Sequence, residues 1–300
     1  MTRPSYLPDN FTLALIGVVT LASVLPARGA AAPFFEGLTT VAIGLLFFMH
    51  GAKLSRQAIV AGIMHWRLHL LVFAATFIMF PVFGLVLRPL LAPLVTPELY
   101  IGVLFLCVLP ATVQSAIAFT SMGRGNIPAA ICSASCSTLV GVFVTPLLVN
   151  LLVVPGGGAG SSFDSIGHIL LQLMAPFVLG HMLRPWIGEW IRRRAGVLRF
   201  VDQGSILLVV FTAFSAAVIE GLWRHVPLSA LAGLLVVCAI LLGLALSSTI
   251  WAARRMGFSK ADEITIVFCG SKKSMVSGIP MAKVLFASSA VGAIVLPLML

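Results

Sequence analysis

Charged side chains are scarce in this chain of 300 residues: Asp, Glu, Lys and Arg make up 9% of it, against roughly 25% in an ordinary soluble domain. Hydrophobic residues make up 60%, and the mean hydropathy is +1.10. No stretch is long and polar enough to form a separate soluble domain. The composition therefore predicts an all-α polytopic membrane protein, because a chain of this length has room for roughly ten helical spans of about 20 residues each.

Several kinds of catalytic and redox site are missing as well. The sequence has no Ser/His/Asp set, no metalloprotease motif and no pair of aspartates inside an apolar run, so we expect no enzyme. The glycine-rich stretch 156–162 lacks the Gly-Lys-Ser/Thr signature of a phosphate-binding loop. We therefore expect no cofactor apart from a coupling ion, Na⁺ or H⁺. The cysteines all fall in apolar runs, where we expect packing residues rather than disulfides; they are Cys107, Cys132, Cys136, Cys238 and Cys269.

Polar, proline and glycine residues divide the sequence into ten apolar runs, each of which predicts a helix. The runs cover residues 11–27, 36–52, 68–91, 99–122, 127–153, 164–187, 200–222, 228–250, 261–286 and 287 onward. The last run reaches Leu300 after 14 residues, fewer than a full crossing needs. We expect this helix either to end inside the membrane or to continue beyond this sequence. At the other end, Arg3 and the first run also imitate a secretory signal peptide, whose cleavage would leave nine spans.

The Lys and Arg residues are unevenly divided between the two predicted sides of the membrane. With ten spans, 13 of them fall on the side of the N-terminus and four on the opposite side, while Lys272 and Lys273 lie inside a run. Positive residues concentrate in cytoplasmic loops, so we expect both termini on the cytoplasmic side. The basic cluster 192–199 is then an anchor that fixes orientation rather than a nucleic-acid patch.

The chain divides into two similar halves. Residues 1–155 and 164–300 each contain five predicted helices, and the glycine-rich stretch 156–163 predicts an external linker between them. Because five is odd, the second half enters the membrane from the opposite side. In each half the fourth helix is interrupted by polar or helix-breaking residues, at 109–115 and at 269–275. This pattern predicts an inverted repeat with a site where the two interrupted helices meet near the middle of the membrane.

Two adjacent cations, Lys272 and Lys273, lie at the centre of the run 261–286. A lysine at the centre of a spanning helix costs roughly 2.5 to 3.5 kcal/mol, so we expect both to face a wet or protein-lined cavity. All nine acidic residues lie at or near predicted helix ends or in loops. Either backbone carbonyls at the interruptions or an anionic solute must then balance the charge. Repulsion between the two ammonium groups favours loss of one proton, which would couple transport to H⁺.

Small polar residues surround the two interruptions and complete the predicted site. They are Gly270, Ser271, Ser274 and Ser277 near the second interruption, Thr112, Gln114 and Ser115 near the first, and Ser133 and Ser135 on the helix after it. Half-helices beginning near Gln114 and Ser274 would direct the positive ends of their dipoles at an anion. Of the histidines, His181 is a candidate proton relay or an interhelical donor. The others, His69 among them, lie near predicted span ends and are expected at the membrane interface.

The chain resembles the bile acid:sodium symporter superfamily, specifically its bacterial sodium-dependent transporter branch related to the seventh member of solute carrier family 10. The resemblance rests on "FFMHGAKLS" at 47–55, "LPATVQSAIAFTSMGRGNIPAAICSASCSTLVGVFVTPLL" at 109–148 and "FCGSKKSMVSGIPMAKVLF" at 268–286. It implies ten helices in two inverted five-helix repeats, with helices 4 and 9 discontinuous and crossing. It also implies a panel of helices 1, 2, 6 and 7 against a core, and a bacterial inner-membrane location.

The sequence departs from this family at the positions that hold sodium. Alignment on the shared glycine, Gly270, puts Phe268 in place of the family's glutamate and Lys272 in place of its glutamine. Alanines stand at three further ligand positions: Ala116, Ala130 and Ala134. A hard cation needs oxygen ligands, preferably charged ones. The ammonium of Lys272 would then replace the ion, and a sodium site near Ser115 and Ser135 is the alternative.

These observations predict a secondary active transporter that carries a small organic anion by alternating access, with Na⁺ or H⁺ as the coupling ion. The lipid bilayer and the solute are its expected partners, without nucleic acid. Sodium-coupled symport of a bile-acid-like or other organic solute is the first alternative. A non-transporting regulator of ion homeostasis is the second, and it would show no saturable flux.

Overall fold

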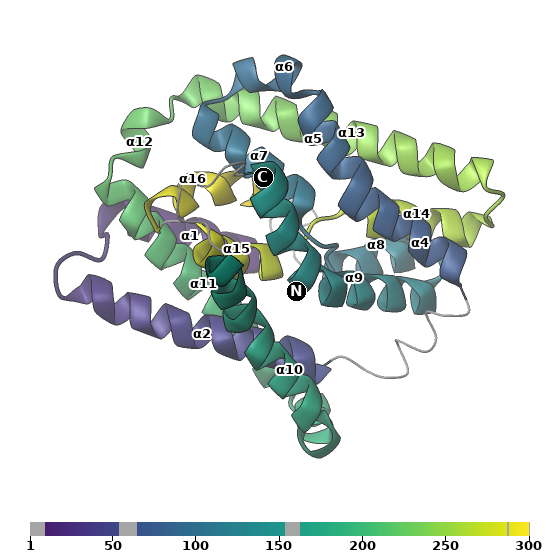
Figure 1. Cartoon of the computed structure of the whole chain (residues 1–300), viewed down its shortest axis with the longest axis horizontal. Helices are drawn as coiled ribbons and strands as arrows, with labels where there is room; N and C mark the ends of the chain where they lie inside the picture. The colour runs from purple at the N-terminus through teal and green to yellow at the C-terminus, as the bar shows by residue number, and fades with distance from the viewer. Residues whose placement is uncertain (1–9, 54–64, 154–162, 287, 300) are drawn as a thin grey trace, which may run out of the picture.

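The computed structural model describes residues 10–53, 65–153, 163–286 and 288–299. These residues form helices joined by short connections, and an isolated antiparallel bridge pairs Ala111 with Lys273 (Figure 1). The predicted linker 156–163 lies, except for its last residue, outside the described residues, as does Arg3.

The helices follow the ten predicted runs closely. In the first half they are α1 (Asn10–Val24), α2 (Ala31–Lys53), α4 (Trp66–Ala74), the π-helical turn η1 (Ala75–Met79), α5 (Phe80–Val86), α6 (Arg88–Leu91), η2 (Ala92–Leu94), α7 (Pro97–Val108), α8 (Gln114–Met122), α9 (Ile127–Leu148) and η3 (Val149–Val153). In the second half they are α10 (Phe163–Arg193), α11 (Ala195–Ile219), α12 (Leu222–His225), α13 (Leu228–Arg255), α14 (Lys260–Ser271), α15 (Met275–Leu285) and α16 (Ser288–Met299).

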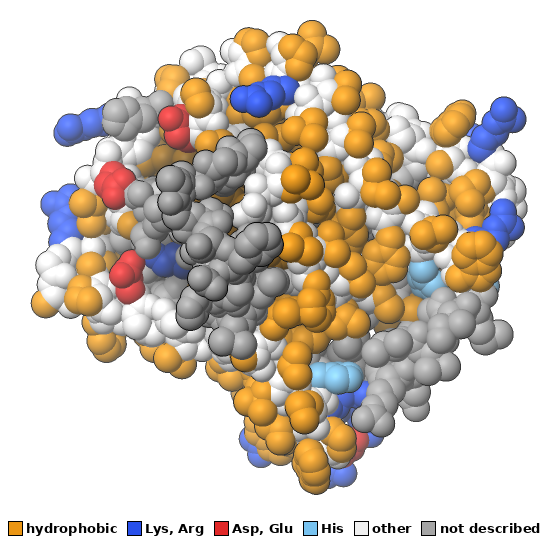
Figure 2. Space-filling model, viewed as in Figure 1, with side chains coloured by type: hydrophobic (Ala, Val, Ile, Leu, Met, Phe, Trp, Pro, Cys, Tyr) orange, Lys and Arg blue, Asp and Glu red, His pale blue; other side chains and the backbone are white. Residues whose placement is uncertain are grey.

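An all-helical membrane protein fits these elements. Within the part of the chain that the structure describes, five helical stretches are long and apolar enough to cross a membrane: Ala31–Lys53, Trp66–Val86, Ile127–Val153, Ala195–Ile219 and Leu228–Arg255. Many large hydrophobic side chains face outward, as expected where lipid rather than water is the solvent. Figure 2 shows such side chains covering much of one face, with most of the charged side chains toward its edges. The arrangement as ten spans in two inverted halves stays a prediction.

Four helices, α1, α2, α10 and α11, pack together and are called the panel helices below (Figure 1). The closest approach is between α2 and α10, where glycines face the opposite backbone. A Cβ atom on Gly51 would overlap the carbonyl oxygen of Phe177, and one on Gly180 would overlap that of Phe48. Glycine therefore permits a backbone-to-backbone contact that any other residue at these two positions would prevent.

Three further helices, α4, α8 and α9, pack around α14, and these four are called the core helices below. Small and apolar residues fill the space between these helices and the neighbouring α13. They are Leu68, Val72, Ala116, Ala129, Ala130, Ala253, Ile266 and Cys269. Alanines on α8 and α9 allow close packing because they add little volume at the contact.

Several helix boundaries differ from the prediction by five or six residues, most clearly between the sixth and seventh helices. The sixth helix was expected to end at 187 and the seventh to begin at 200, but α10 continues to Arg193 and α11 begins at Ala195. Arginine is a good helix former, so the basic cluster extends both helices instead of forming a loop between them. Arg199 consequently lies in the first turns of α11, where its position depends on helical geometry.

Candidate functional site

The two interrupted helices meet at their interruptions. The N–H of Thr112 donates to the carbonyl of Lys272 at 3.2 Å, and the N–H of Ser274 donates to the carbonyl of Pro110 at 2.9 Å. The N–H of Ala111 donates to the Ser137 hydroxyl on α9 at 3.0 Å. Backbone groups that a continuous helix would satisfy internally are thus paired across the crossing, as an apolar environment requires.

Two half-helices begin at this crossing, at the positions that the sequence predicts. Helix α8 starts at Gln114, and α15 starts at Met275 after an N-cap at Ser274. The Ser274 hydroxyl accepts a hydrogen bond from the N–H of Ser277 at 3.3 Å. The first N–H groups of a helix lack carbonyl partners within it and lie at the positive end of the helix dipole, so a helix start favours a negative charge nearby.

The two adjacent lysines have different surroundings. The Lys273 ammonium donates to the carbonyls of Thr76, Cys107 and Leu109 at 2.8, 3.0 and 2.9 Å. The Lys272 ammonium instead lies 5.1 Å from the ring centroid of Phe119 on α8. Backbone carbonyls, one of the two sources foreseen from the sequence, therefore balance the charge of Lys273.

A cleft separates the panel helices from the crossing. Three adjoining cavities of about 610, 140 and 210 Å³ form it, and Lys53 lines all three. From the panel helices it is lined by Phe11, His50, Lys53, Phe177, Arg184, Arg192, Arg199, Asp202 and Gln203, among others. From the other side it is lined by Thr112, Val113, Gln114, Ser135, Thr138, Leu139, Ser274 and Val276.

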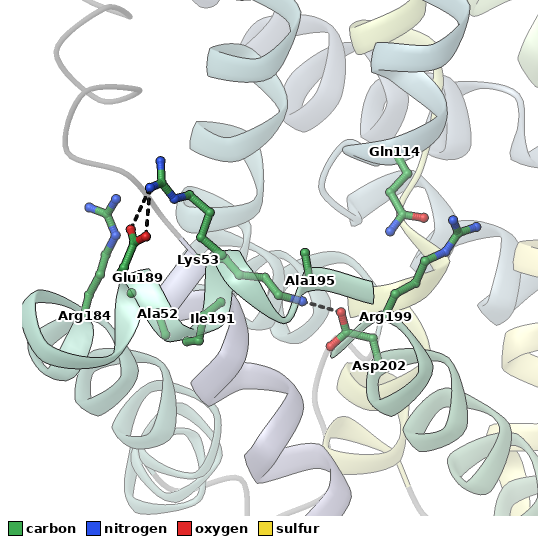
Figure 3. Close-up of a pocket in the computed structure, with 11 residues that line it drawn as sticks. Ala52, Lys53, Gln114, Arg184, Glu189, Ile191, Ala195, Arg199 and Asp202 are labelled. Carbon is green, nitrogen blue, oxygen red and sulfur yellow. Dashed lines mark hydrogen bonds and ion pairs between the residues drawn. The ribbon is translucent and has the colours of Figure 1, made fainter. Parts of the chain in front are cut away.

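The charged side chains that line the cavity of about 610 Å³ are predominantly positive. Four basic side chains, from Lys53, Arg184, Arg192 and Arg199, line it together with two acidic ones, from Glu189 and Asp202. Asp202 pairs with the Lys53 ammonium, and Glu189 pairs with Arg192 at 2.8 Å. Figure 3 shows these pairs. The lining therefore carries an excess of positive charge, which favours an anionic occupant.

Arg199 lies where the cleft reaches the crossing. It extends from α11 toward Gln114 at the start of α8, as Figure 3 shows. Both residues, together with Ser274 at the start of α15, line the same cavity of about 140 Å³. A guanidinium group and two half-helix starts thus converge on one small space.

The predicted site residues are distributed between this cleft and the packed interior. Thr112, Gln114, Ser135 and Ser274 line the cleft. Ser271 and Ser277 are buried, and their hydroxyls have no hydrogen-bond partner among the described residues. Gly270 packs against Ala75 and Thr249, Ser115 is half-buried on α8, and Ser133 is buried beside His69.

Some residues of the cleft were not predicted as site residues. Lys53 and Arg199 were counted only as cytoplasmic charges, and Asp202 only as an acid near a helix end. Their spacing on α11 is a detectable signal, since Arg199, Asp202, Gln203 and Ile206 recur at helical intervals and all line one cavity. The partner of Asp202, on α2, lies 149 residues earlier, beyond the reach of any local pattern.

His69, which the sequence predicts near the end of a span, lies in the first turns of α4 and faces other helices, and its depth in the membrane stays a prediction. Its side chain is buried on α4, and Nδ1 lies 2.6 Å from the Ser133 hydroxyl on α9. Its Nε2 has no partner among the described residues. The helical spacing from Leu68 and Val72, which are also buried, places His69 on the inward face of α4.

Comparison with known proteins gives a consistent result. The model of the SBF-like CPA transporter family matches residues 9–300. The chain is 67% identical over 300 residues to "Uncharacterized protein PA2026" of Pseudomonas aeruginosa, covering all of this chain and 90% of that protein. It is 58% identical to "Putative symporter YfeH" of Escherichia coli strain K12, covering 97% of this chain and 88% of that one. Sodium/bile acid cotransporter 7 of Danio rerio is 29% identical, with 92% and 83% covered.

Proposed function

Since the chain belongs to the SBF-like CPA transporter family, we propose that this membrane transporter carries a small organic anion by alternating access. The observation that carries the proposal is the basic cleft, which leads from Arg184 and Arg199 to the starts of α8 and α15. A solute with a carboxylate, sulfate or phosphate group would find positive charge along the cleft and half-helix starts at its inner end.

Three residues are proposed to hold the anionic group. Arg199 supplies a planar pair of donors that can hold a carboxylate through two parallel hydrogen bonds. Gln114 and Ser274 supply neutral donors beside the two half-helix starts. Contacts from opposite sides of the cleft would let the bound solute bridge the panel helices and the crossing, which is what coupling solute binding to a relative movement requires.

We further propose the membrane arrangement that the sequence predicts: ten spans in two inverted halves, both termini cytoplasmic, in a bacterial inner membrane. The cleft would then open to the cytoplasm, since the basic helix ends that line it belong to the positive-rich side. Movement of the panel helices against the core helices would close this side and open the other.

The two lysines are assigned different parts in this proposal. Lys273 would act on the anion through its positive field, because its N–H groups already donate to carbonyls. Lys272, held over an aromatic ring, retains its N–H groups for water or for the solute as the cleft changes shape. Ser271 and Ser277 lie too deep to meet the solute in this conformation and would support the backbone at the crossing.

Sodium is the proposed coupling ion in a second version of the mechanism. The observation that favours it is the printed name of the relatives called sodium/bile acid cotransporter 7. In this chain Ser135 and the carbonyls near the crossing would supply the oxygen ligands, with Ser115 beside them. Coupling to H⁺ is the alternative, and comparing a sodium gradient with a pH gradient distinguishes the two.

The test is uptake of labelled monocarboxylates, dicarboxylates and sulfonates into vesicles that contain the purified protein. We expect saturable uptake of one of these anions, and Arg199→Gln should raise its KM roughly tenfold, the loss of one charge-assisted bond pair. Arg255→Gln is the matched control, because Arg255 is an exposed arginine outside the cleft and the change in net charge is the same.

Two outcomes would contradict the proposal. Uptake of a neutral analogue in preference to the anion would refute the assignment of solute charge. A complete lack of saturable flux for any anion, under sodium and pH gradients alike, would favour the non-transporting regulator instead.

A further inference from the structure

A backbone carbonyl is left without its helical partner at Thr76. In the π-helical turn η1 the N–H of Phe80 donates to the carbonyl of Ala75, five residues earlier, instead of to Thr76. The next residue is Pro81, which has no N–H to offer. The Thr76 carbonyl therefore lacks both the α-helical and the π-helical donor, and it must be satisfied from outside its own helix.

Two further carbonyls, those of Cys107 and Leu109, lack helical partners where α7 ends. The residue three positions after Cys107 is Pro110, which has no N–H, and the N–H of the following Ala111 donates to Ser137. Leu109 is extended rather than helical, so its carbonyl also points away from α7. The intervening carbonyl, of Val108, accepts from the Thr145 hydroxyl at 2.8 Å. Two oxygens at the negative end of the α7 dipole are thus available.

One ammonium group fills the space between these three carbonyls. The Lys273 Nζ lies 2.8, 3.0 and 2.9 Å from the oxygens of Thr76, Cys107 and Leu109. Its distance from the ring centroid of Phe80 is 4.2 Å. An ammonium has three N–H donors, and each is matched by one carbonyl. The ring faces the same positive charge with its electron-rich side.

We propose that these three carbonyls and the Phe80 ring form a monovalent-cation site, which the protein fills with its own Lys273 ammonium. Carbonyl rings of this kind replace the hydration shell of a cation in ion-selective proteins. The ligands come from η1, from Phe80 at the start of α5 and from the end of α7, and the ammonium that fills the site comes from the connection between α14 and α15. Lys273 is accordingly a positioning residue that holds the crossing together, independently of which solute is carried.

The proposal makes a specific prediction for Lys273→Ala. Truncation empties the site and leaves the three carbonyls unpaired, so the unfolding temperature in detergent should fall by roughly 5 to 10 °C when choline is the only cation. Ammonium or K⁺, at the same ionic strength, should restore a large part of the loss, because both are small enough to enter where choline is not. The wild-type protein should show no such difference between the salts.

Two further variants test whether recovery in ammonium or K⁺ requires an emptied carbonyl site. Lys273→Met keeps most of the side-chain volume, so it should lose stability without recovering it in ammonium or K⁺. Lys272→Ala is the matched control, because the neighbouring ammonium faces Phe119 and should leave no carbonyl site behind. Equal responses of Lys273→Ala and the wild-type protein to the salts would overturn the proposal, as would a salt response of Lys272→Ala.

A measurement on the unaltered protein decides the matter if Lys273→Ala does not fold. Reductive methylation of the native protein in detergent, read out by peptide mass spectrometry, should modify Lys53 and Lys272 well before Lys273. The reason is that all three N–H groups of Lys273 are engaged. Modification of Lys273 at the rate of Lys272 would show that its ammonium is free, and the proposal would fail.

Discussion

The crossing of the two interrupted helices has a closed side and an open side. On the closed side the Ala111 N–H donates to the Ser137 hydroxyl, the Lys273 ammonium donates to backbone carbonyls, and Pro110 packs against Gly141. On the open side, Thr112, Gln114 and Ser274 line a cleft that contains the unbalanced positive charge of the panel helices. Hydrogen bonds that hold the crossing together thus lie on one side of it, and the proposed solute contacts lie on the other.

The difference teaches that a charge inside a predicted membrane span need not be the charge that binds the solute. Lys273 is the most conspicuous residue in the sequence, yet its N–H groups are all used within the protein. Arg199 is unremarkable in sequence, but it extends into the cleft beside Gln114 (Figure 3). Substitutions on the closed side should therefore change stability, whereas those on the open side should change affinity.

The largest effect is expected for Gly141→Ala on the closed side. A Cβ atom at this position would lie 2.5 Å from Cβ and 2.8 Å from Cγ of Pro110. Overpacking of this kind costs about 1 to 3 kcal/mol of unfolding free energy, more than the gain of up to about 1 kcal/mol from replacing a helical glycine. Thermal unfolding in detergent measures the difference.

Gly243→Ala on α13 is the control, since no atom lies within 4 Å of a Cβ atom there. It should leave the unfolding temperature unchanged or raise it. If Gly141→Ala behaves in the same way, the contact with Pro110 is not tight and the closed side is looser than described.

A comparable effect, confined to one of two variants, is expected for the pair Ser137→Ala and Ser135→Ala, two serines on the same helix. The first removes the acceptor of the buried Ala111 N–H and should cost about 1 to 3 kcal/mol of unfolding free energy. The second lies on the open side and should cost less than about 0.5 kcal/mol. Denaturation of both variants, with uptake measured in parallel, should show loss of stability in one and altered uptake in the other. The reverse assignment would contradict the division into two sides.

The smallest effect is expected for Asp202→Asn on the open side. Removing this carboxylate frees the Lys53 ammonium and adds one positive charge to the cleft lining. Anion affinity should rise by a few fold, roughly what one partly screened charge supplies, and the gain should shrink as salt is added. Stability should change by no more than about 1 kcal/mol, since Lys53 is partly exposed. Weaker anion binding in this variant would mean that the ion pair itself shapes the site.

The positions of the interruptions could be predicted from local sequence. Pro110 ends one helix, and the run of Ser271, Lys272 and Lys273 is unfavourable inside another, so both interruptions fell within the predicted stretches. The starts of α8 and α15 were also predicted correctly, near Gln114 and Ser274. Ser274 caps α15 through its hydroxyl, as serine commonly does, whereas α8 begins after Val113 without a side-chain cap.

The partners of the charged groups could not be predicted in the same way. The carbonyl of Thr76 lies 197 residues from Lys273 in sequence, and nothing in a local pattern brings them together. Pro81 and Pro110 did carry a usable signal, since a proline frees a carbonyl that must then find a distant donor. The cleft was missed because Arg199 and Lys53 depend on how the panel helices pack, which the charge count by loops ignores.

The glycine contact between α2 and α10 restricts how the cleft can change shape. Gly51 and Gly180 bring each backbone against the other, so neither helix can slide along its neighbour without collision. Both helices also carry cleft residues, Lys53 on one and Arg184 on the other. Any gate formed by this pair of helices must therefore tilt as one rigid body. The backbone must then bend at the ends of the two helices rather than along their contact.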